Sequence, residues 1–519
     1  MSHNYIIIFI LFFLNSFQLF SQKTTVKWGP EYKKSTRSAI SKIIGEDEKG
    51  MYVLKEKIGF YSANTVILER YDKKMSQVFS KELTIPEQGV GKMIYEGIFY
   101  INKQLVLLSS YVNKEQKKNY AFAHLISSSG EIQPEFQKLA EVDFEKNNRP
   151  GGFTFTMSND SSKFLVHINS PYDRKDNEKF SYKVFDASLS LIWEKNMEIP
   201  YSDKYTTISN YNVDNTGNVY MILTKYPDKS KGEKAERNTQ AAEYMVTRYN
   251  YQTETFKKYK IDLGEKWVES ISYDINEKTN ELAVAGFYSK DKYNSIAGIF
   301  YTSIDLETEQ QKVVSLKPFD KEFLSLFMNE RKAEKGKELR NFYFDYFFLK
   351  KSGGALLIAE RYYVTTHTST DSQGNTRTYT IYHYDDLIVA NVNSKGDIEW
   401  IRKVPKRSGA KDGGYYLSYA VLYNEERESL QILFNDNPKN ITRLKEDPDA
   451  KAVPMKNVKK SVATLVSIED GFMKRKPLFE AKDAKTILKP NFYLQTSNNS
   501  LITLGIKGNK YRFGEFLFE

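Results

Sequence analysis

Seven polar residues in three short stretches of the chain could act together on a ligand. They are Glu360, Arg361, His383, Asp385, Asp386, Asn435 and Asp436. A pair of carboxylates beside a histidine and an arginine can perform general acid–base chemistry on a glycosidic bond, or can bind a sugar or a peptide. Because the spacing matches no established catalytic motif, we predict a binding role for these residues and assign no catalytic residue. Structural capping or simple solvation of these side chains is the alternative.

Motifs for metals and cofactors are not recognisable in the sequence. The 519 residues include five histidines and no cysteine, which leaves no credible set of zinc ligands. His367 stands alone in a polar stretch, where a solvated side chain is the commoner role. No glycine-rich loop follows a strand and opens a helix, and no Gly-x-Ser-x-Gly nucleophile motif is present. We therefore expect neither a metal nor a cofactor.

One short unit recurs along the chain and must position these residues. A strand ends in an apolar residue followed by a small polar one, a tight polar turn comes next, and a second strand begins. Copies start at 70–72, 125–127, 184–186, 248–250, 303–305, 391–393 and 467–471. Asp, Asn, Ser and Gly suit such turns because their side chains or backbone freedom close tight hairpins. Seven hairpins are predicted.

A second pair of strands precedes each hairpin, and the later strand of that pair is almost entirely apolar. Examples are 104–108, 163–166, 218–223, 281–285, 354–358 and 430–434. A continuous apolar strand in an antiparallel sheet is buried on both faces, which requires a neighbouring sheet on either side. Four strands repeating at roughly 55 to 75 residues predict the radially stacked blades of a β-propeller.

The two ends of the chain are predicted to share one blade. The last segment supplies three strands, beginning near Phe492 and continuing over 501–506 and 511–518. The stretch 24–28 is a strand without a local partner, and pairing with the C-terminal strands would remove the free edge. The predicted fold is therefore all-β, a propeller of about eight four-stranded blades, with seven as the alternative.

In this blade pattern the chain resembles the broad β-propeller group of exported bacterial proteins related to TolB-like and WD-like repeats. The resemblance covers nearly the whole chain after residue 22, but it lies in architecture and strand order and implies no functional residues. The segment 158–164 departs from the sialidase-type Asp-box after Asp160, so sialidase chemistry is not implied.

Residues 1–21 are predicted to be a signal peptide, followed by a single propeller domain over 22–519. The apolar run 5–14 is too short to span a bilayer and lies before Ser21, a small residue suited to a cleavage site, although the preceding residues lack Lys and Arg. Without cysteine the protein cannot be a lipoprotein. We expect it in the periplasm or at the cell surface or outside the cell, with no transmembrane segment in the mature chain.

The charge pattern argues against a nucleic-acid partner. The formal net charge is +10, but basic and acidic residues alternate along the chain instead of forming one basic footprint. The expected partner is an envelope protein or a glycan. The sequence does not indicate the oligomeric state.

Loop lengths distinguish the two faces of the predicted ring. With the strands of a blade labelled a to d, the a–b and c–d turns lie on one face and are all tight. The long connections join b to c or d to a, and they are 225–241, 316–340, 362–380, 405–414 and 435–459. Loops on a rigid scaffold commonly carry binding residues, so this loop-rich face is the predicted binding face.

Two of these connections have a recognisable internal pattern. Phe319, Phe323, Leu326 and Phe327 lie at helical spacing and predict one amphipathic helix that ends near Gly336 and packs on the rim. The Thr-rich insertion 365–380 predicts a projecting hairpin or a mobile loop.

Two classes of function, and a third weaker one, remain open from the sequence. The leading hypothesis is a non-enzymatic envelope module that binds a protein or glycan through the loop-rich face. The alternative is a secreted or periplasmic hydrolase of glycans or peptides that uses the carboxylates of Glu360, Asp385, Asp386 and Asp436. The third is a purely structural part of a larger assembly.

Overall fold

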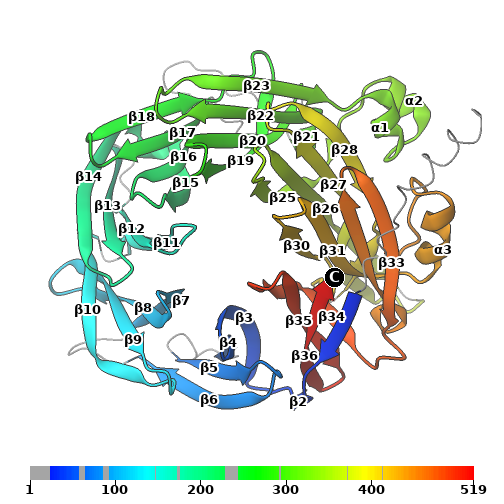
Figure 1. Ribbon diagram of the computed structural model, residues 1–519, viewed down its shortest axis with the longest axis horizontal. Coiled ribbons are helices and arrows are strands. Elements are labelled where there is room, and N and C mark those ends of the chain that lie inside the picture. Colours follow the sequence, from blue (N-terminus) through cyan, green and yellow to red (C-terminus); the bar gives the residue numbers. More distant parts are fainter. Residues whose placement is uncertain are drawn as a thin grey trace, which may run out of the picture.

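The protein is an eight-bladed β-propeller. The computed structural model describes residues 24–57, 65–85, 93–146, 148–171, 176–227, 243–290, 294–370, 372–411 and 413–518. Within these ranges, eight antiparallel sheets surround a central axis (Figure 1). Each has four main strands, and two of the sheets carry one further short strand. The prediction of about eight blades is confirmed. The predicted signal peptide lies outside the described residues.

In seven blades the four strands follow one another outward from the axis in chain order, and in the eighth the last three strands of the chain are followed outward by the first one. The innermost strands are β3 (Ser38–Asp47), β7 (Ile94–Ile101), β11 (Gly152–Met157), β15 (Thr206–Val213), β19 (Trp267–Asn276), β25 (Phe342–Leu349), β30 (Ala420–Asn424) and β34 (Ile487–Gln495). The second strands are β4 (Gly50–Lys57), β8 (Gln104–Asn113), β12 (Lys163–Asn169), β16 (Val219–Lys225), β20 (Glu281–Ser289), β26 (Ala355–Thr370), β31 (Ser429–Asp436) and β35 (Ser500–Lys507).

The outer half of each blade is a hairpin, except in the eighth, where strands from the two ends of the chain pair. The third strands are β5 (Thr65–Asp72), β9 (Lys118–Ile126), β13 (Asn177–Asp186), β17 (Glu243–Asn250), β22 (Gly298–Asp305), β27 (Thr376–Val392), β32 (Val462–Glu469) and β36 (Lys510–Phe518). The outermost strands are β6 (Gln77–Thr84), β10 (Ile132–Asp143), β14 (Leu191–Ser202), β18 (Thr255–Lys260), β23 (Gln311–Pro318), β28 (Ile398–Val404), β33 (Phe472–Glu480) and β1 (Thr24–Trp28).

The hairpin turns form because one side-chain oxygen replaces several backbone partners. The Oδ1 atom of Asp72 accepts the backbone N–H groups of Lys74 and Ser76, each at 2.8 Å. Asp186 and Asn393 make the same pair of bonds in their own turns. Asp and Asn therefore recur at the end of the third strand because they close the turn that follows.

The hydrophobic core consists of layers between neighbouring blades. The second strands provide its centre, as their apolar composition predicts. Leu356 and Ile358 of β26 pack in one cluster with Ile432 and Phe434 of β31 in the next blade. Each of these side chains is at most 4% exposed. A blade is thus stable only between its neighbours.

The ring closes where β1 pairs with β36, from Thr24 opposite Phe518 to Trp28 opposite Gly514. This confirms the predicted pairing of the two ends. The short strand β2 (Tyr32–Lys33) also pairs with β36. The Trp28 ring contacts the edges of the Phe479 and Phe516 rings, with centroids 5.5 and 6.0 Å away.

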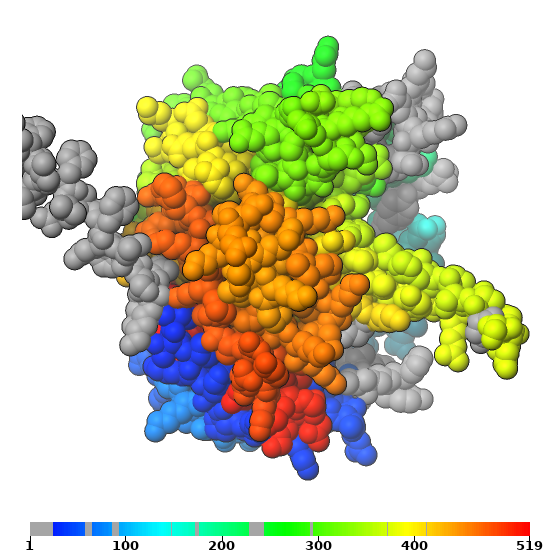
Figure 2. Space-filling view, turned by 90° about the vertical axis from the view of Figure 1, so that its right-hand side faces the viewer, coloured from blue at the N-terminus to red at the C-terminus, as the bar shows by residue number. Residues whose placement is uncertain are grey.

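All five long connections named above join second to third strands or outer to inner strands, so they lie on one face. They contain α1 (Lys321–Ser325), α2 (Glu330–Glu334), β24 (Leu339–Arg340), β29 (Ser408–Ala410), α3 (Lys439–Glu446) and η3 (Val458–Lys460). The shorter connections on this face contain η1 (Asp203–Tyr205) and β21 (Ser295–Ile296), and β21 pairs with β24. The strands β26 and β27 continue past their blade as a projecting hairpin (Figure 2).

One local expectation was wrong. The segment predicted as a single amphipathic helix forms two short helices, because the Asn329 side chain accepts the N–H of Lys332 and starts α2. Its aromatic residues still pack on the rim, where Phe319, Phe323 and Phe327 join the cluster that contains Phe342. No helix among the described residues is long and apolar enough to cross a membrane.

Removing the Trp28 ring should destabilise the ring closure. For Trp28→Ala we expect a loss of about 2–4 kcal/mol in the free energy of unfolding, somewhat below the range for a fully buried tryptophan because this one is half-buried. Urea unfolding followed by far-UV circular dichroism measures it. The control Trp267→Ala removes a ring that is 39% exposed and should cost less than about 1 kcal/mol. Equal losses in both variants would contradict the closing role of Trp28.

Candidate functional site

Two of the predicted binding residues, Glu360 and Asp386, lie in a buried network beneath the loop-rich face. The Lys406 ammonium, which is 1% exposed, donates to Glu360 Oε1 at 2.6 Å, and the Ser418 hydroxyl donates to Glu360 Oε2 at 2.7 Å. Asp386 accepts the backbone N–H of Lys406 at 3.1 Å and lies 3.8 Å from the Lys403 ammonium. Burial raises the pKa of Asp386, and the Lys403 charge opposes that rise.

Asn435 and Asp436 belong to the same layer. Arg475 forms a buried salt bridge with Asp436 at 2.5 Å and also donates to the Pro405 carbonyl. The Asn440 amide donates to the other Asp436 oxygen at 2.7 Å. The Asn435 amide donates to two backbone carbonyls, each at 2.9 Å. These contacts tie the long connections of blades six and seven together.

The remaining three predicted residues lie at the base of the projecting hairpin. The His383 ring stacks on Tyr363 with centroids 4.4 Å apart, and the Tyr363 hydroxyl donates to Asp385 at 3.0 Å. The Arg361 guanidinium lies 5.2 Å from the centre of the Tyr363 ring. Burial lowers the pKa of His383, and the Asp385 charge partly offsets this. The structure thus divides the seven residues into a buried network and a hairpin base, and their contact with a ligand remains a prediction.

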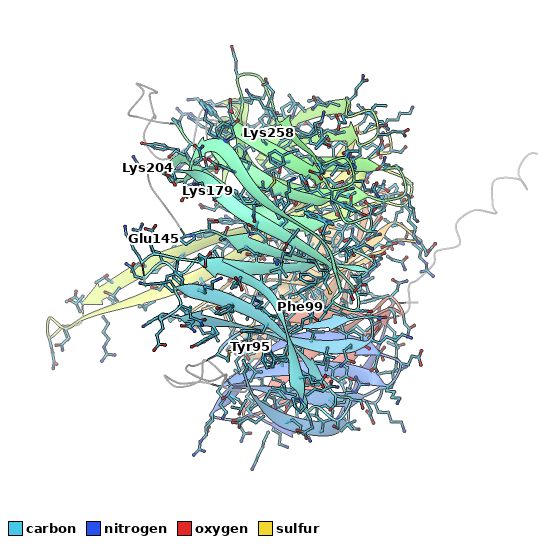
Figure 3. All side chains as sticks on the ribbon, turned by 90° about the vertical axis from the view of Figure 1, so that its left-hand side faces the viewer. Tyr95, Phe99, Glu145, Lys179, Lys204 and Lys258 are labelled. Atoms are coloured by element: carbon cyan, nitrogen blue, oxygen red, sulfur yellow. The ribbon has the colours of Figure 1, made fainter. Side chains whose placement is uncertain are left out.

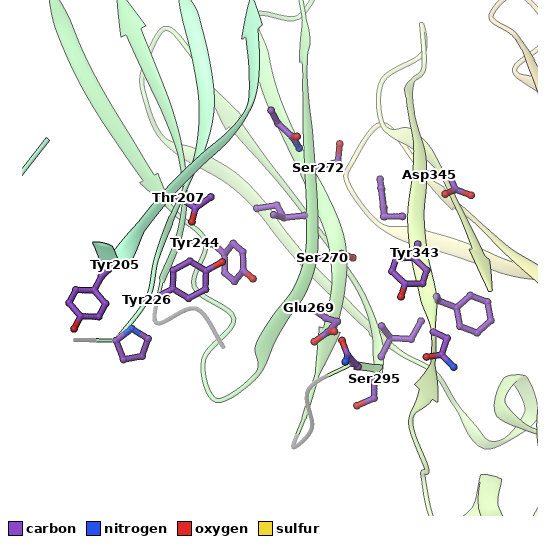
Figure 4. A pocket seen from close by; sticks show the side chains of 18 of the residues that line it. Tyr205, Thr207, Tyr226, Tyr244, Glu269, Ser270, Ser272, Ser295, Tyr343 and Asp345 are labelled. Carbon is purple, nitrogen blue, oxygen red and sulfur yellow. The ribbon is translucent and has the colours of Figure 1, made fainter. Parts of the chain in front are cut away.

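A cavity of about 1050 Å³ opens elsewhere on the loop-rich face, between the inner strands of blades four, five and six (Figure 4). Residues of the connections on that face, such as Tyr205 and Tyr226, form its rim. Tyr244 lies on the same side as these two rings, and Tyr343 lies across the cavity from them. Tyr343 is 55% exposed, which is unusual for a large ring in an inner strand.

The polar groups of the cavity come from three irregular positions. Asn210 of β15, Glu269 of β19 and Asp345 of β25 each lie where the register with the second strand shifts. Such β-bulges re-aim a side chain that regular alternation would direct elsewhere. Asn210 has a positive φ of 52°, a conformation that asparagine tolerates better than most residues. Three neighbouring bulges therefore turn polar groups toward one space.

Two carboxyl groups in this cavity have raised pKa values. Burial raises the pKa of Glu269 to about 7, with the Asn294 backbone N–H opposing the rise and the nearby Glu338 charge adding to it. Asp345 is open to the cavity but enclosed by protein on its other sides, which raises its pKa to about 7. The Tyr419 hydroxyl, which donates to it at 2.7 Å, limits that rise. Near neutral pH each carboxyl can both donate and accept a hydrogen bond.

Sequence reasoning missed both carboxyl groups. A bulge depends on the partner strand, so Glu269 has no local signature that distinguishes it from a solvated residue. Asp345 does have one, because it is the single charged residue in the aromatic run 342–349. A lone charge in such a strand indicates a position with a special environment.

The cavity holds no evident metal site. Across the described ranges, no three His, Asp or Glu side chains converge in a way that could hold a metal ion. The polar groups of the cavity are suited to hydrogen bonding with an organic ligand.

Comparisons with known proteins give distant structural likenesses only. No protein-family model matches the sequence, and no curated protein matches it either. The chain is similar to a mutant of Synechocystis apocarotenoid oxygenase, with 9% identity, 86% of this chain and 90% of that chain covered, and a TM-score of 0.36. It is also similar to a DUF4221 family member from Bacteroides vulgatus, with 12% identity, coverages of 77% and 93%, and a TM-score of 0.28. A prolyl endopeptidase gives 10% identity, coverages of 84% and 46%, and a TM-score of 0.34.

The raised pKa of Glu269 predicts a pH-dependent effect of Glu269→Gln. When the folded-state pKa of a carboxyl is raised to about 7, the fold loses stability as the pH rises from the ordinary pKa of that carboxyl through 7. Gln does not ionise and so removes that loss. We expect the free energy of unfolding of the variant to exceed that of the natural protein by about 1–2 kcal/mol at pH 8, after discounting for partial exposure. At pH 4 the two values should be equal. Urea unfolding at both pH values measures the difference.

A matched variant should show the opposite sign. The Lys312 hydrogen bond holds the pKa of Asp305 well below its ordinary range. Asp305→Asn should therefore be less stable than the natural protein at pH 7, and the two should converge in acid. A Glu269→Gln effect that is the same at pH 4 and pH 8 would contradict the assignment.

The buried network predicts a large cost for Lys406→Met. Removing this cation leaves the buried Glu360 carboxylate without its partner. We expect the free energy of unfolding to fall by about 3–5 kcal/mol. Adding Glu360→Gln should restore part of it. The control Lys81→Met breaks a salt bridge with Glu131 at the surface and should cost less than about 1 kcal/mol. Thermal and urea unfolding measure all three, and no recovery in the double variant would contradict the pairing.

Proposed function

We propose that this protein is an exported, non-enzymatic binding module of the cell envelope that receives a glycan or protein partner at its loop-rich face. The observation that carries the proposal is the cavity of about 1050 Å³ on that face, built by the inner strands of three consecutive blades. Concave sites of this size with a few convergent polar groups are where proteins commonly bind small ligands.

The lining of the cavity favours a neutral glycan. Tyr205, Tyr226 and Tyr343 offer apolar ring faces together with hydroxyl groups. Sugar hydroxyls both donate and accept hydrogen bonds, and so do amide side chains and carboxyl groups that are half protonated. Glu269 and Asp345, with pKa values near 7, meet that requirement. Permanently charged carboxylates could only accept hydrogen bonds.

Export is part of the proposal. The apolar run 5–14 ahead of Ser21 suits a signal peptide, and the absence of cysteine suits a compartment in which the fold does not depend on disulfides. The propeller fold agrees with the resemblance to exported bacterial propellers of the TolB-like and WD-like kind.

If the protein is a hydrolase, its catalytic carboxyls are other residues than those named from the sequence. Glu360, Asp386 and Asp436 are held by Lys406, Lys403 and Arg475. Glu269 and Asp345 would instead support acid–base chemistry, because they line the cavity, where a substrate can reach them, and their pKa values are raised.

Titration of neutral oligosaccharides tests the proposal. We expect at least one of the six-residue fragments of cellulose, chitin or starch to bind in isothermal titration calorimetry, and Tyr343→Ala to weaken that binding at least tenfold. Tyr415→Ala is the control, because Tyr415 is 38% exposed and does not line the cavity.

Two results would count against the binding module. If none of the fragments bound, the glycan assignment would fail. If a bound fragment were cleaved, as judged by chromatography, and Glu269→Gln abolished cleavage, the protein would be a hydrolase.

A further inference from the structure

The projecting hairpin offers a strand edge that no described strand occupies. The inner strand β25 pairs with β26 only as far as Phe342 opposite Arg361. Beyond that point β26 and β27 remain paired with each other, from Tyr362 opposite Tyr384 to Thr370 opposite Thr376. In Figure 3 the hairpin extends on the side where Lys179 and Lys204 lie, which is the loop-rich face. The Tyr362 N–H still donates to the Asn341 carbonyl at 2.8 Å, so among the described residues the outer edge of β26 is open over 363–370.

This open edge lacks the usual protection against strand pairing. Natural edge strands are blunted by charges, prolines or bulges. The stretch 362–370 contains no Lys, Arg, Asp, Glu or Pro, and seven of its nine residues are β-branched or aromatic. Its Val364 is 43% exposed. The register beyond the shift at Arg361 is regular.

The hairpin has its own cross-strand contacts, so the edge keeps its shape away from the blade. The hydroxyls of Thr368 and Thr378 lie 3.2 Å apart across the strands. The rings of His367 and Tyr379 stack with centroids 5.5 Å apart. Cross-strand pairs of these kinds stabilise a two-stranded ribbon.

The face of the hairpin that carries His367 and His383 is electropositive. Arg361 lies over Tyr363 and its Nε atom is buried without a partner, while the Lys411 ammonium lies 3.7 Å from the centre of the Tyr379 ring. Arg407 lies near enough to contribute to the lowered pKa of His383. The nearby carboxylate of Asp385 accepts from the Tyr363 hydroxyl. The hairpin thus pairs a bare strand edge with an excess of positive charge.

We propose that an extended peptide segment of a partner protein, with acidic side chains at alternate positions, adds to the free edge of β26 as a further strand. The main-chain groups of 363–370 supply hydrogen bonds to such a strand, and Arg361 meets its acidic side chains. A second copy of this chain suits the edge less well. The net charge of +10 repels a second copy, and two eight-residue strands bury less area than a stable dimer needs.

Fluorescence anisotropy with a labelled synthetic peptide of ten alternating Val and Glu residues tests the proposal on the full-length protein. We expect this acidic peptide to bind at least tenfold more tightly than a matched peptide of alternating Val and Lys. Arg361→Gln should weaken its binding several-fold, and added salt should do the same. Equal affinity for the two peptides, or no binding of the acidic one, would overturn the proposal.

Two neighbouring proline substitutions separate edge pairing from other modes of binding. Backbone N–H groups of alternate residues in β26 point toward β27 and away from it, so Thr366→Pro and His367→Pro affect opposite edges. Hydrogen exchange over 362–384 identifies the variant that keeps its pairing with β27. That variant should lose peptide binding at least tenfold, and retained binding would overturn the proposal.

Two further measurements test which molecule binds the β26 edge and whether the cavity takes part. Sedimentation showing a dimer that the edge-blocking proline abolishes would replace the peptide with a second copy and overturn the proposal. Tyr205→Ala should leave peptide binding unchanged, because Tyr205 lines the cavity on the side opposite Tyr343 and belongs to another blade than the hairpin. Failure of the glycan titrations therefore leaves this test intact, and the reverse also holds.

Discussion

The pairing of β1 with β36 is the constraint on which the rest of the structure depends. Every blade buries both faces of its second strand against neighbours, so an unclosed ring would expose two core layers and a bare strand edge. The sequence has no cysteine, so no disulfide can hold the ends. Non-covalent contacts alone must therefore join residues from the two ends of the chain.

A buried polar cluster reinforces that closure. Lys55 and Tyr71 of the first blade both contact Glu69, at 2.6 and 2.7 Å, and both contact the Tyr511 hydroxyl of the closing strand, at 2.9 and 3.1 Å. Breaking any one of these contacts would leave a buried group without its partner, which is costly in a low-dielectric interior. The cluster thus favours the register in which the first and last blades meet.

Most of the fold could be predicted because its rules are local. The small polar residues of the outer hairpin turns and the apolar run of each second strand are both visible in the sequence, and together they fix the blades. The cavity could not be predicted in the same way. Glu269 lines the cavity because of a bulge, and that bulge depends on how β19 pairs with β20. Glu360 was predicted to bind a ligand, since its buried partner Lys406 lies far away in the sequence. Long-range pairing decided both outcomes.

Carboxylates on the loop-rich face have two different fates, and the difference indicates where function lies. Glu360 and Asp436 each have a buried cation and further donors, so their hydrogen-bonding capacity is spent on holding the connections. Glu269 and Asp345 line the cavity and form no salt bridge with a described cation, and burial raises the pKa of both. A group that must bind a ligand needs unused hydrogen-bonding capacity, and a group that must hold a scaffold does not. The network and the cavity therefore serve different ends, because the rigid connections around blades six and seven keep the open carboxyls and the projecting hairpin in fixed positions.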